Sequence, residues 1–173
     1  MEGSGQHQLG EHARDNAEIA RVLQQIADML EFKNENSFKM RSYQMAAETI
    51  GSMGTPIAEI AERGGTNELQ KLPGIGKTIS GQILEIVQTG KSQYFEELTQ
   101  DVPASVLDLR RVSGIGLKTA QLLYRDFGIK SLEELKSLAE SGGLKSVPGL
   151  GEKSLARITK SLERLMGNPV NNE

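Results

Sequence analysis

The segment Leu72-Pro73-Gly74-Ile75-Gly76-Lys77-Thr78-Ile79 is the strongest indication of the fold of this 173-residue chain, because its pattern occurs twice more further along. The second copy is Val112-Ser113-Gly114-Ile115-Gly116-Leu117-Lys118-Thr119-Ala120, and the third is Val147-Pro148-Gly149-Leu150-Gly151-Glu152-Lys153-Ser154-Leu155. The first glycine of each pair stands at position 74, 114 or 149, so the copies are 40 and then 35 residues apart. A period of this length is typical of a repeated supersecondary unit, here two short helices joined by a glycine-rich turn.

Two other interpretations of these glycines fail on spacing. A phosphate loop of the Walker A kind that ends in Gly76-Lys77-Thr78 needs a glycine at position 71, which is Lys71. A dinucleotide-binding turn that starts at Gly74 needs a glycine at position 79, which is Ile79, and a preceding strand that the pattern does not show. Neither nucleotide-binding loop is therefore predicted.

Each repeat instead predicts a tight turn between two helices that can bind an anion. Glycine takes the positive φ that such a turn needs, and it leaves neighbouring N–H groups uncovered. The central aliphatic residue (Ile75, Ile115 or Leu150) is expected to point inward, and the second glycine to begin the next helix, where unpaired N–H groups and the helix dipole attract phosphate. Three plain turns between packed helices remain the alternative. The predicted phosphate-binding residues of the repeats are Gly74, Ile75, Gly76, Lys77, Thr78, Gly114, Ile115, Gly116, Lys118, Thr119, Gly149, Gly151, Lys153 and Ser154.

The remaining periodicity predicts an all-α fold, a bundle of short helices in two small subdomains. Apolar residues recur in steps of three and four from Asn16, with Asp15 or Asn16 as the N-cap. A second helix is expected over about residues 38–53 with Ser37 as its N-cap, and a third over about 56–63, ending at Gly64-Gly65. We expect a disordered leader over residues 1–15, helical domains over 16–98 and 99–166, and a frayed tail over 167–173.

Composition removes several classes of protein. The chain has no Cys, and its two His, His7 and His12, lie near the N-terminus, which argues against a disulfide scaffold, a thiolate zinc site and a histidine centre. No apolar run approaches the ~18 residues of a membrane span and no signal peptide is visible, so we expect a cytoplasmic protein without a membrane partner. The formal charge of −3 argues against a polycation, yet residues 64–166, which hold the repeats, carry 14 Lys and Arg against 12 Asp and Glu.

The repeats resemble helix-hairpin-helix DNA-binding motifs, and residues 16–165 as a whole resemble the N-terminal region of the family X DNA polymerases. The resemblance lies in Phe38-Lys39-Met40-Arg41-Ser42-Tyr43 followed by Ala46-Ala47, in Lys71-Leu72-Pro73-Gly74-Ile75-Gly76-Lys77, and in Arg111-Val112-Ser113-Gly114-Ile115-Gly116. It implies a small lyase-type domain with the first hairpin, followed by a domain that grips duplex DNA. Helix-hairpin-helix motifs also occur in ligases, glycosylases, excision nucleases and junction-processing proteins.

The resemblance implies a pocket for the 5′ phosphate at a gap or nick. Lys39 and Tyr43 match two of its positions, and their spacing of four residues places both on one helix face. Arg41, Lys71 and Lys77 are candidate additional contacts, with a solvated basic face as the alternative. The resemblance also implies a monovalent cation, Na⁺ or K⁺, between a DNA phosphate and the backbone carbonyls of the first two hairpins, with no other cofactor required. By position, those carbonyls belong to Gln70, Leu72, Ile75, Arg110, Val112 and Ile115.

The departures from the family bear on catalysis. The lysine that forms a Schiff base with an abasic sugar in the lyase-active members is matched by Gln82, whose amide cannot form an imine, and an assisting lysine is matched by Thr78. The adjacent acids Glu96-Glu97 and Glu133-Glu134 diverge around a helix, whereas nucleotidyl transfer needs clustered carboxylates for two metal ions. The sequence therefore predicts no polymerase, exonuclease or phosphoesterase site among these residues.

The sequence favours a non-enzymatic, sequence-independent DNA-binding module of DNA repair that recognises gapped, nicked or branched duplex through backbone amides. Three alternatives stay open. The chain is the separated front end of a family X repair polymerase, or it retains deoxyribose-phosphate lyase chemistry through Lys77 or Lys39, or it is an interaction scaffold that packs on repair proteins.

Overall fold

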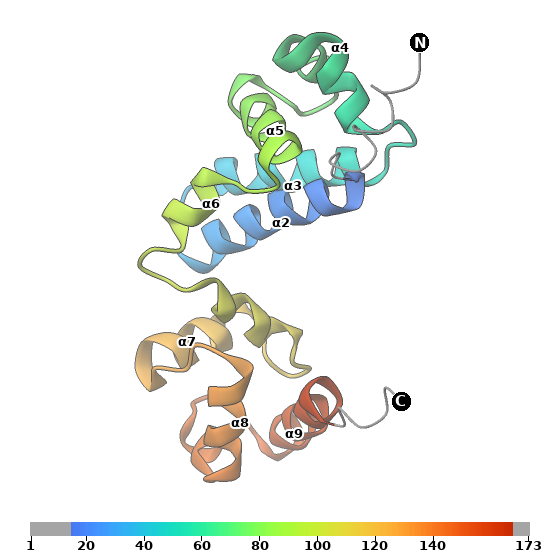
Figure 1. Cartoon of the computed structure of the whole chain (residues 1–173). Helices are drawn as coiled ribbons and strands as arrows, with labels where there is room; N and C mark the ends of the chain where they lie inside the picture. The colour runs from blue at the N-terminus through green and yellow to red at the C-terminus, as the bar shows by residue number, and fades with distance from the viewer. Residues whose placement is uncertain (1–14, 168–173) are drawn as a thin grey trace. The chain divides into compact units, whose positions relative to one another are not determined.

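The computed structural model describes residues 15–167, and every regular element in that range is helical, as the sequence predicts. These residues form two compact units, one ending at Gln100 and the other beginning at Asp101 (Figure 1). The predicted disordered leader and frayed tail lie outside the described residues, apart from Asp15 and Gly167. None of the described helices combines the length and apolar character needed to cross a bilayer.

The first unit is built on a pair of adjacent helices. Its elements are α2 (Asn16–Phe32), α3 (Ser37–Gly51), α4 (Ile57–Leu69), α5 (Lys77–Thr89) and α6 (Gln93–Leu98). Helices α2 and α3 pack along each other, α5 and α6 also contact α2, and α4 packs on α5 (Figure 1). The fully buried side chains of this core come from α2, α3, α4 and α5, and include Ile19, Leu23, Ile26, Leu30, Tyr43, Ile50, Ile57, Leu69, Ile83 and Ile86.

Helix boundaries in the first unit follow local capping, with one change from the sequence prediction. Asp15 caps α2 by accepting a hydrogen bond of 2.7 Å from the N–H of Glu18, as expected. The N-cap of α3 is Asn36 and not Ser37, because the Asn36 side chain accepts from the two N–H groups that follow Ser37. Asn16 joins distant segments, since its side chain accepts from the N–H of Ile57 at 2.8 Å and so satisfies the start of α4.

The third helix is longer than its sequence pattern suggests. Its backbone leaves helical geometry at Gly65 (φ 58°, ψ −141°), which agrees with the expected end at Gly64-Gly65. A further helical turn then runs to Leu69, whose side chain is completely buried. This turn leads directly into the first glycine hairpin, and burial of Leu69 anchors the start of that hairpin to the core.

The second unit packs short helices around the other two hairpins. Its elements are the 3₁₀ helix η1 (Ala104–Arg111), α7 (Leu117–Phe127), α8 (Leu132–Glu140), the 3₁₀ helix η2 (Gly143–Ser146) and α9 (Glu152–Met166). Helix α8 contacts η1, η2 and α9, and α7 contacts η1 (Figure 1). Its fully buried core side chains include Val106, Leu109, Ala120, Leu123, Leu135 and Ile158.

Candidate nucleic-acid interface

The three glycine turns share one backbone geometry. The first glycine of each has a positive φ, 76° at Gly74, 99° at Gly114 and 84° at Gly149, which a residue with a Cβ rarely adopts. In each turn the N–H of the central aliphatic residue donates to the carbonyl three residues earlier. These bonds are Ile75 to Leu72 (3.2 Å), Ile115 to Val112 (3.1 Å) and Leu150 to Val147 (3.4 Å). The sequence repeat is therefore a structural repeat.

The second glycine of each turn is the N-cap of the helix that follows, so Gly76, Gly116 and Gly151 begin α5, α7 and α9. No side chain caps these three helices. Four other helices do carry a side-chain cap, and the capping residues are Asp15, Asn36, Ser92 and Ser131. The hairpin helices thus leave their first N–H groups for a ligand, and their dipoles favour an anion there.

The turns differ in how deeply they are anchored. Ile75 and Ile115 are 4% and 5% exposed, which agrees with the expected inward orientation, whereas Leu150 is only half-buried. A Cβ on Gly114 would lie 3.2 Å from Ile158, so the second hairpin packs tightly under α9. A Cβ on Gly149 would meet nothing within 4 Å. The third hairpin is therefore the most open of the three.

The first hairpin forms one wall of a pocket of about 330 Å³, and α3 forms the other. The structure brings together six of the predicted site residues here, although α3 and the hairpin are more than 30 positions apart in sequence. Ser42 lines the pocket as well and was missed by the sequence analysis, although it lies three residues after Lys39 and so on the same helix face. The lining residues are Lys39, Ser42, Tyr43, Gly74, Gly76, Lys77, Thr78 and Ile79.

Tyr43, which lines this pocket, is held by contacts with two other side chains. Its ring is 1% exposed and stacks on the ring of Tyr94 from α6, with centroids 5.8 Å apart and planes 18° apart. The amide nitrogen Nε2 of Gln82 donates a hydrogen bond of 2.6 Å to its hydroxyl oxygen. Burial raises the pKa of Tyr43 to about 12, although the hydrogen bond from Gln82 acts in the opposite direction. The hydroxyl therefore keeps its hydrogen at neutral pH and can donate it to an anion.

Lys39, an exposed residue that lines the pocket, has its ammonium group against an aromatic face. Its Nζ is 4.4 Å from the centroid of Tyr94, a cation–π distance. The same ring therefore contacts both predicted phosphate ligands of α3. Tyr94 was not singled out from the sequence, because it lies 51 positions after Tyr43 and no spacing rule connects the two residues.

Two of the candidate additional contacts do not line this pocket. Lys71 forms an ion pair of 2.6 Å with Glu68, three residues earlier. Arg41 is exposed on α3. Lys77, the third candidate, does line the pocket at the first position of α5. The pocket therefore combines two lysines, a phenol and the N-terminal amides of a helix.

In the second unit, one helix links the second hairpin to the third. The side chain of Ser161, on α9, accepts a hydrogen bond of 2.9 Å from the N–H of Ser113. Lys118 and Lys153 are exposed in the first turn of α7 and α9, and Thr119 and Ser154 are half-buried beside them. The basic residues Arg157, Lys160 and Arg164 are exposed along α9.

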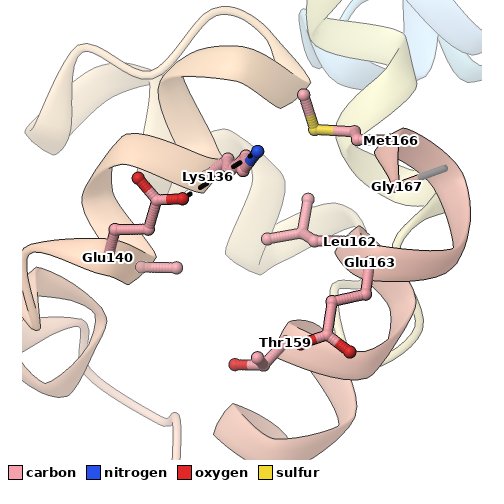
Figure 2. Close-up of a pocket in the computed structure, with 8 residues that line it drawn as sticks. Lys136, Glu140, Thr159, Leu162, Glu163, Met166 and Gly167 are labelled. Carbon is pink, nitrogen blue, oxygen red and sulfur yellow. Dashed lines mark ion pairs between the residues drawn. The ribbon is translucent and has the colours of Figure 1, made fainter. Parts of the chain in front are cut away.

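A second cavity, of about 230 Å³, lies between α8 and α9 (Figure 2). Figure 2 shows Leu162 and Met166 at the cavity, with the Lys136–Glu140 ion pair of 3.9 Å on the α8 side. None of the predicted site residues lines it. Within residues 15–167, no group of three or more Asp, Glu or His side chains is arranged around a common metal position.

Comparison with known proteins identifies both units. Residues 14–92 match a helix-hairpin-helix domain, and residues 106–164 match a SAM-like helix-hairpin-helix tandem. The chain is 30% identical to the DNA polymerase/3′-5′ exonuclease PolX of Bacillus subtilis over 87% of its own length and 25% of that protein. It is 34% identical to the DNA nucleotidylexotransferase of Ambystoma mexicanum over 65% of its length and 21% of that protein.

A third relative comes from a different group of DNA-processing proteins. The chain is 29% identical to the Holliday junction branch migration complex subunit RuvA of Acidovorax over 57% of its own length and 52% of that protein. The chain thus spans about half of RuvA, and a quarter or less of PolX and of the nucleotidylexotransferase.

Proposed function

We propose that this chain, which has helix-hairpin-helix domains in both of its units and is homologous to the family X DNA polymerases, binds DNA through phosphate contacts at gaps, nicks or branch points in DNA repair. The observation that carries the proposal is the contrast between its helix N-termini. Three helices begin at a glycine hairpin with no side-chain cap, whereas side chains cap α2, α3, α6 and α8. The uncapped amides of each hairpin suit a phosphate of a nucleic-acid backbone.

Binding of this kind is independent of base sequence. Backbone N–H groups and lysines contact phosphate oxygens, which are the same at every nucleotide. Lys77, Lys118 and Lys153 lie one or two residues after the N-cap glycines, so each hairpin adds a positive charge to its amides. With roughly four to six phosphate contacts, the affinity is expected to be modest and to fall steeply with salt.

The pocket beside the first hairpin supports a finer proposal, that it holds a terminal 5′ phosphate. A phosphate monoester carries between one and two negative charges at neutral pH and offers three terminal oxygens, which is more than an internal diester offers. Lys39 and Lys77 supply two ammonium groups, Tyr43 supplies a neutral hydroxyl donor, and the start of α5 supplies amides. Donors from several directions around a pocket of this size suit a monoester better than a chain of diesters.

A monovalent cation, Na⁺ or K⁺, is part of the proposal at the first two hairpins. The carbonyl of Leu72 accepts one hydrogen bond, from Ile75, and the carbonyl of Val112 accepts one from Ile115, so each oxygen keeps a lone pair for a cation. Neutral carbonyls fit a monovalent ion, which would offset the charge of a DNA phosphate. The carbonyls of Gln70, Leu72 and Ile75 would hold one ion, and those of Arg110, Val112 and Ile115 the other.

Lyase chemistry remains a second candidate because Lys39 and Lys77 place two amines on the same pocket. The residue at the position of the family nucleophile is Gln82, and its amide donates a hydrogen bond to Tyr43. Borohydride reduction on a duplex with an incised abasic site separates the two functions. We expect DNA binding without a covalent adduct, and a trapped adduct that Lys39→Ala or Lys77→Ala abolishes would establish the lyase.

Fluorescence anisotropy on a panel of DNA structures tests the main proposal. The panel holds a one-nucleotide gap with a 5′ phosphate, the same gap with a 5′ hydroxyl, a nick, a four-way junction and an intact duplex, each across a salt series. We expect the tightest binding to the phosphorylated gap. Absence of binding to every structure at low salt would contradict a DNA-binding function, while equal binding to the two gaps would contradict only the 5′-phosphate pocket.

A further inference from the structure

We propose that Gln82 and Tyr94 are positioning residues for phosphate recognition, which hold Tyr43 and Lys39 in place without contacting the phosphate themselves. The inference rests on the proposed function of the pocket beside the first hairpin. It concerns Gln82 on α5 and Tyr94 on α6, which contact Tyr43 and Lys39 of α3.

Gln82 sets the direction in which the Tyr43 hydroxyl donates. A phenol has one hydrogen to donate, and Gln82 occupies an acceptor position of the oxygen with its own N–H at 2.6 Å. The hydroxyl hydrogen must therefore point elsewhere, and Tyr43 lines the pocket. If the side chain at position 82 accepted from the hydroxyl instead, Tyr43 would have no hydrogen left for phosphate.

The carbonyl end of the Gln82 amide lacks a partner within the described part of the chain, so the contact with Tyr43 comes with a loss of folding stability. Its carbonyl oxygen Oε1 is buried without a hydrogen-bond partner among the described residues. A buried unsatisfied acceptor destabilises a fold, and an aliphatic side chain at this position would avoid that cost. The useful part of the side chain is thus its N–H group, which contacts Tyr43.

The ring of Tyr94 contacts both of the proposed phosphate ligands on α3, Tyr43 and Lys39. It stacks on Tyr43 at a centroid distance of 5.8 Å and lies 4.4 Å from the ammonium of Lys39. A lysine on an exposed helix face otherwise samples many rotamers, and ordering it on binding costs free energy. The Tyr94 ring restricts the position of the ammonium before DNA binds, in the pocket that Tyr43 also lines.

The test uses the full chain and the ratio of its dissociation constants for the 5′-hydroxyl and 5′-phosphate gaps, which we call the phosphate preference. Gln82→Met keeps the length of the side chain and removes both polar ends. We expect it to lower the phosphate preference about five- to tenfold with an unchanged or higher melting temperature, because the orphan acceptor is also removed. Tyr94→Leu should lower the preference in the same way, whereas Tyr94→Phe, which keeps the ring, should preserve it.

A double-mutant cycle separates positioning from direct contact. If Gln82 acts through Tyr43, then Gln82→Met in a Tyr43→Phe background causes no further loss. Additive losses, or a wild-type phosphate preference in both Gln82→Met and Tyr94→Leu, would overturn the inference. A wild-type chain that binds duplex but shows no phosphate preference would instead overturn the 5′-phosphate pocket itself, and the two failures are therefore distinct.

Discussion

The hydroxyl of Ser161 on α9 accepts a hydrogen bond of 2.9 Å from the backbone N–H of Ser113, which directly precedes the first glycine of the second hairpin. Ser161 is 4% exposed. Gly114, which follows Ser113 in the chain, packs under Ile158 of α9. Because α9 also begins at the third hairpin, the position of one hairpin depends on the other.

Ser161→Ala should therefore lower the folding stability of the second unit. The substitution leaves the N–H of Ser113 without its partner, which we expect to lower the free energy of unfolding by about 1–2 kcal/mol. Urea unfolding of the full chain measures this. Thr159→Ala, on the exposed side of the same helix, is the matched control and should change stability by less than ~0.5 kcal/mol. An equal effect of the two substitutions would contradict the coupling role of Ser161.

The two glycines of the second hairpin should respond differently to substitution. A Cβ on Gly116 meets nothing within 4 Å, so Gly116→Val should fold, yet its branched side chain would cover the amides of α7 and reduce DNA binding several-fold. Gly114 has a φ of 99° and little space, so Gly114→Ala should cost about 1–2 kcal/mol of stability.

The measurement for these glycines pairs a thermal melt with anisotropy on duplex DNA. A combined Gly76→Val, Gly116→Val and Gly151→Val chain that still folds and binds DNA as the wild type does would show that the hairpin amides are not the binding surface.

Stability at alkaline pH should report on Tyr43. Its pKa rises from 10.0 to about 12 on folding, so the folded state holds the phenol proton more tightly than the unfolded chain. The resulting stability is fully present below pH 10 and is lost as the pH rises from 10 to about 12. We expect Tyr43→Phe to remove this part of the pH dependence, measured by denaturant unfolding at a series of alkaline pH values. Identical pH profiles for the two chains would contradict the burial of the phenol.

The exposed basic residues of α9 should contribute to the salt dependence of DNA binding. Each lysine or arginine that contacts a phosphate adds about 0.9 to the slope of log K against log salt. Replacing Arg157, Lys160 and Arg164 by Ala should therefore lower the slope by up to about 2–3. Lys136→Ala, on α8 beside the second cavity, is the control and should leave the slope unchanged. An unchanged slope in the triple variant would indicate that these residues face solvent and do not contact phosphate.

The structural features that the sequence predicted are those that depend on residues close together in the chain. The three hairpins, the helices that begin at Gly76, Gly116 and Gly151, and the all-α fold follow from local spacing and from the conformational freedom of glycine. One local prediction was wrong: the N-cap of α3 is Asn36 and not Ser37, since the Asn36 side chain accepts from two N–H groups of the first turn.

The local sequence is thus enough to locate the three glycine hairpins and the residues that follow them. Tertiary packing sets how deeply each turn is anchored, with Ile75 and Ile115 buried and Leu150 half-buried. It also decided that Gln82 and Tyr94 surround Tyr43, since their contacts join helices far apart in the chain and depend on packing. Such contacts produce no periodic pattern in the sequence, because each joins a single pair of residues from different helices.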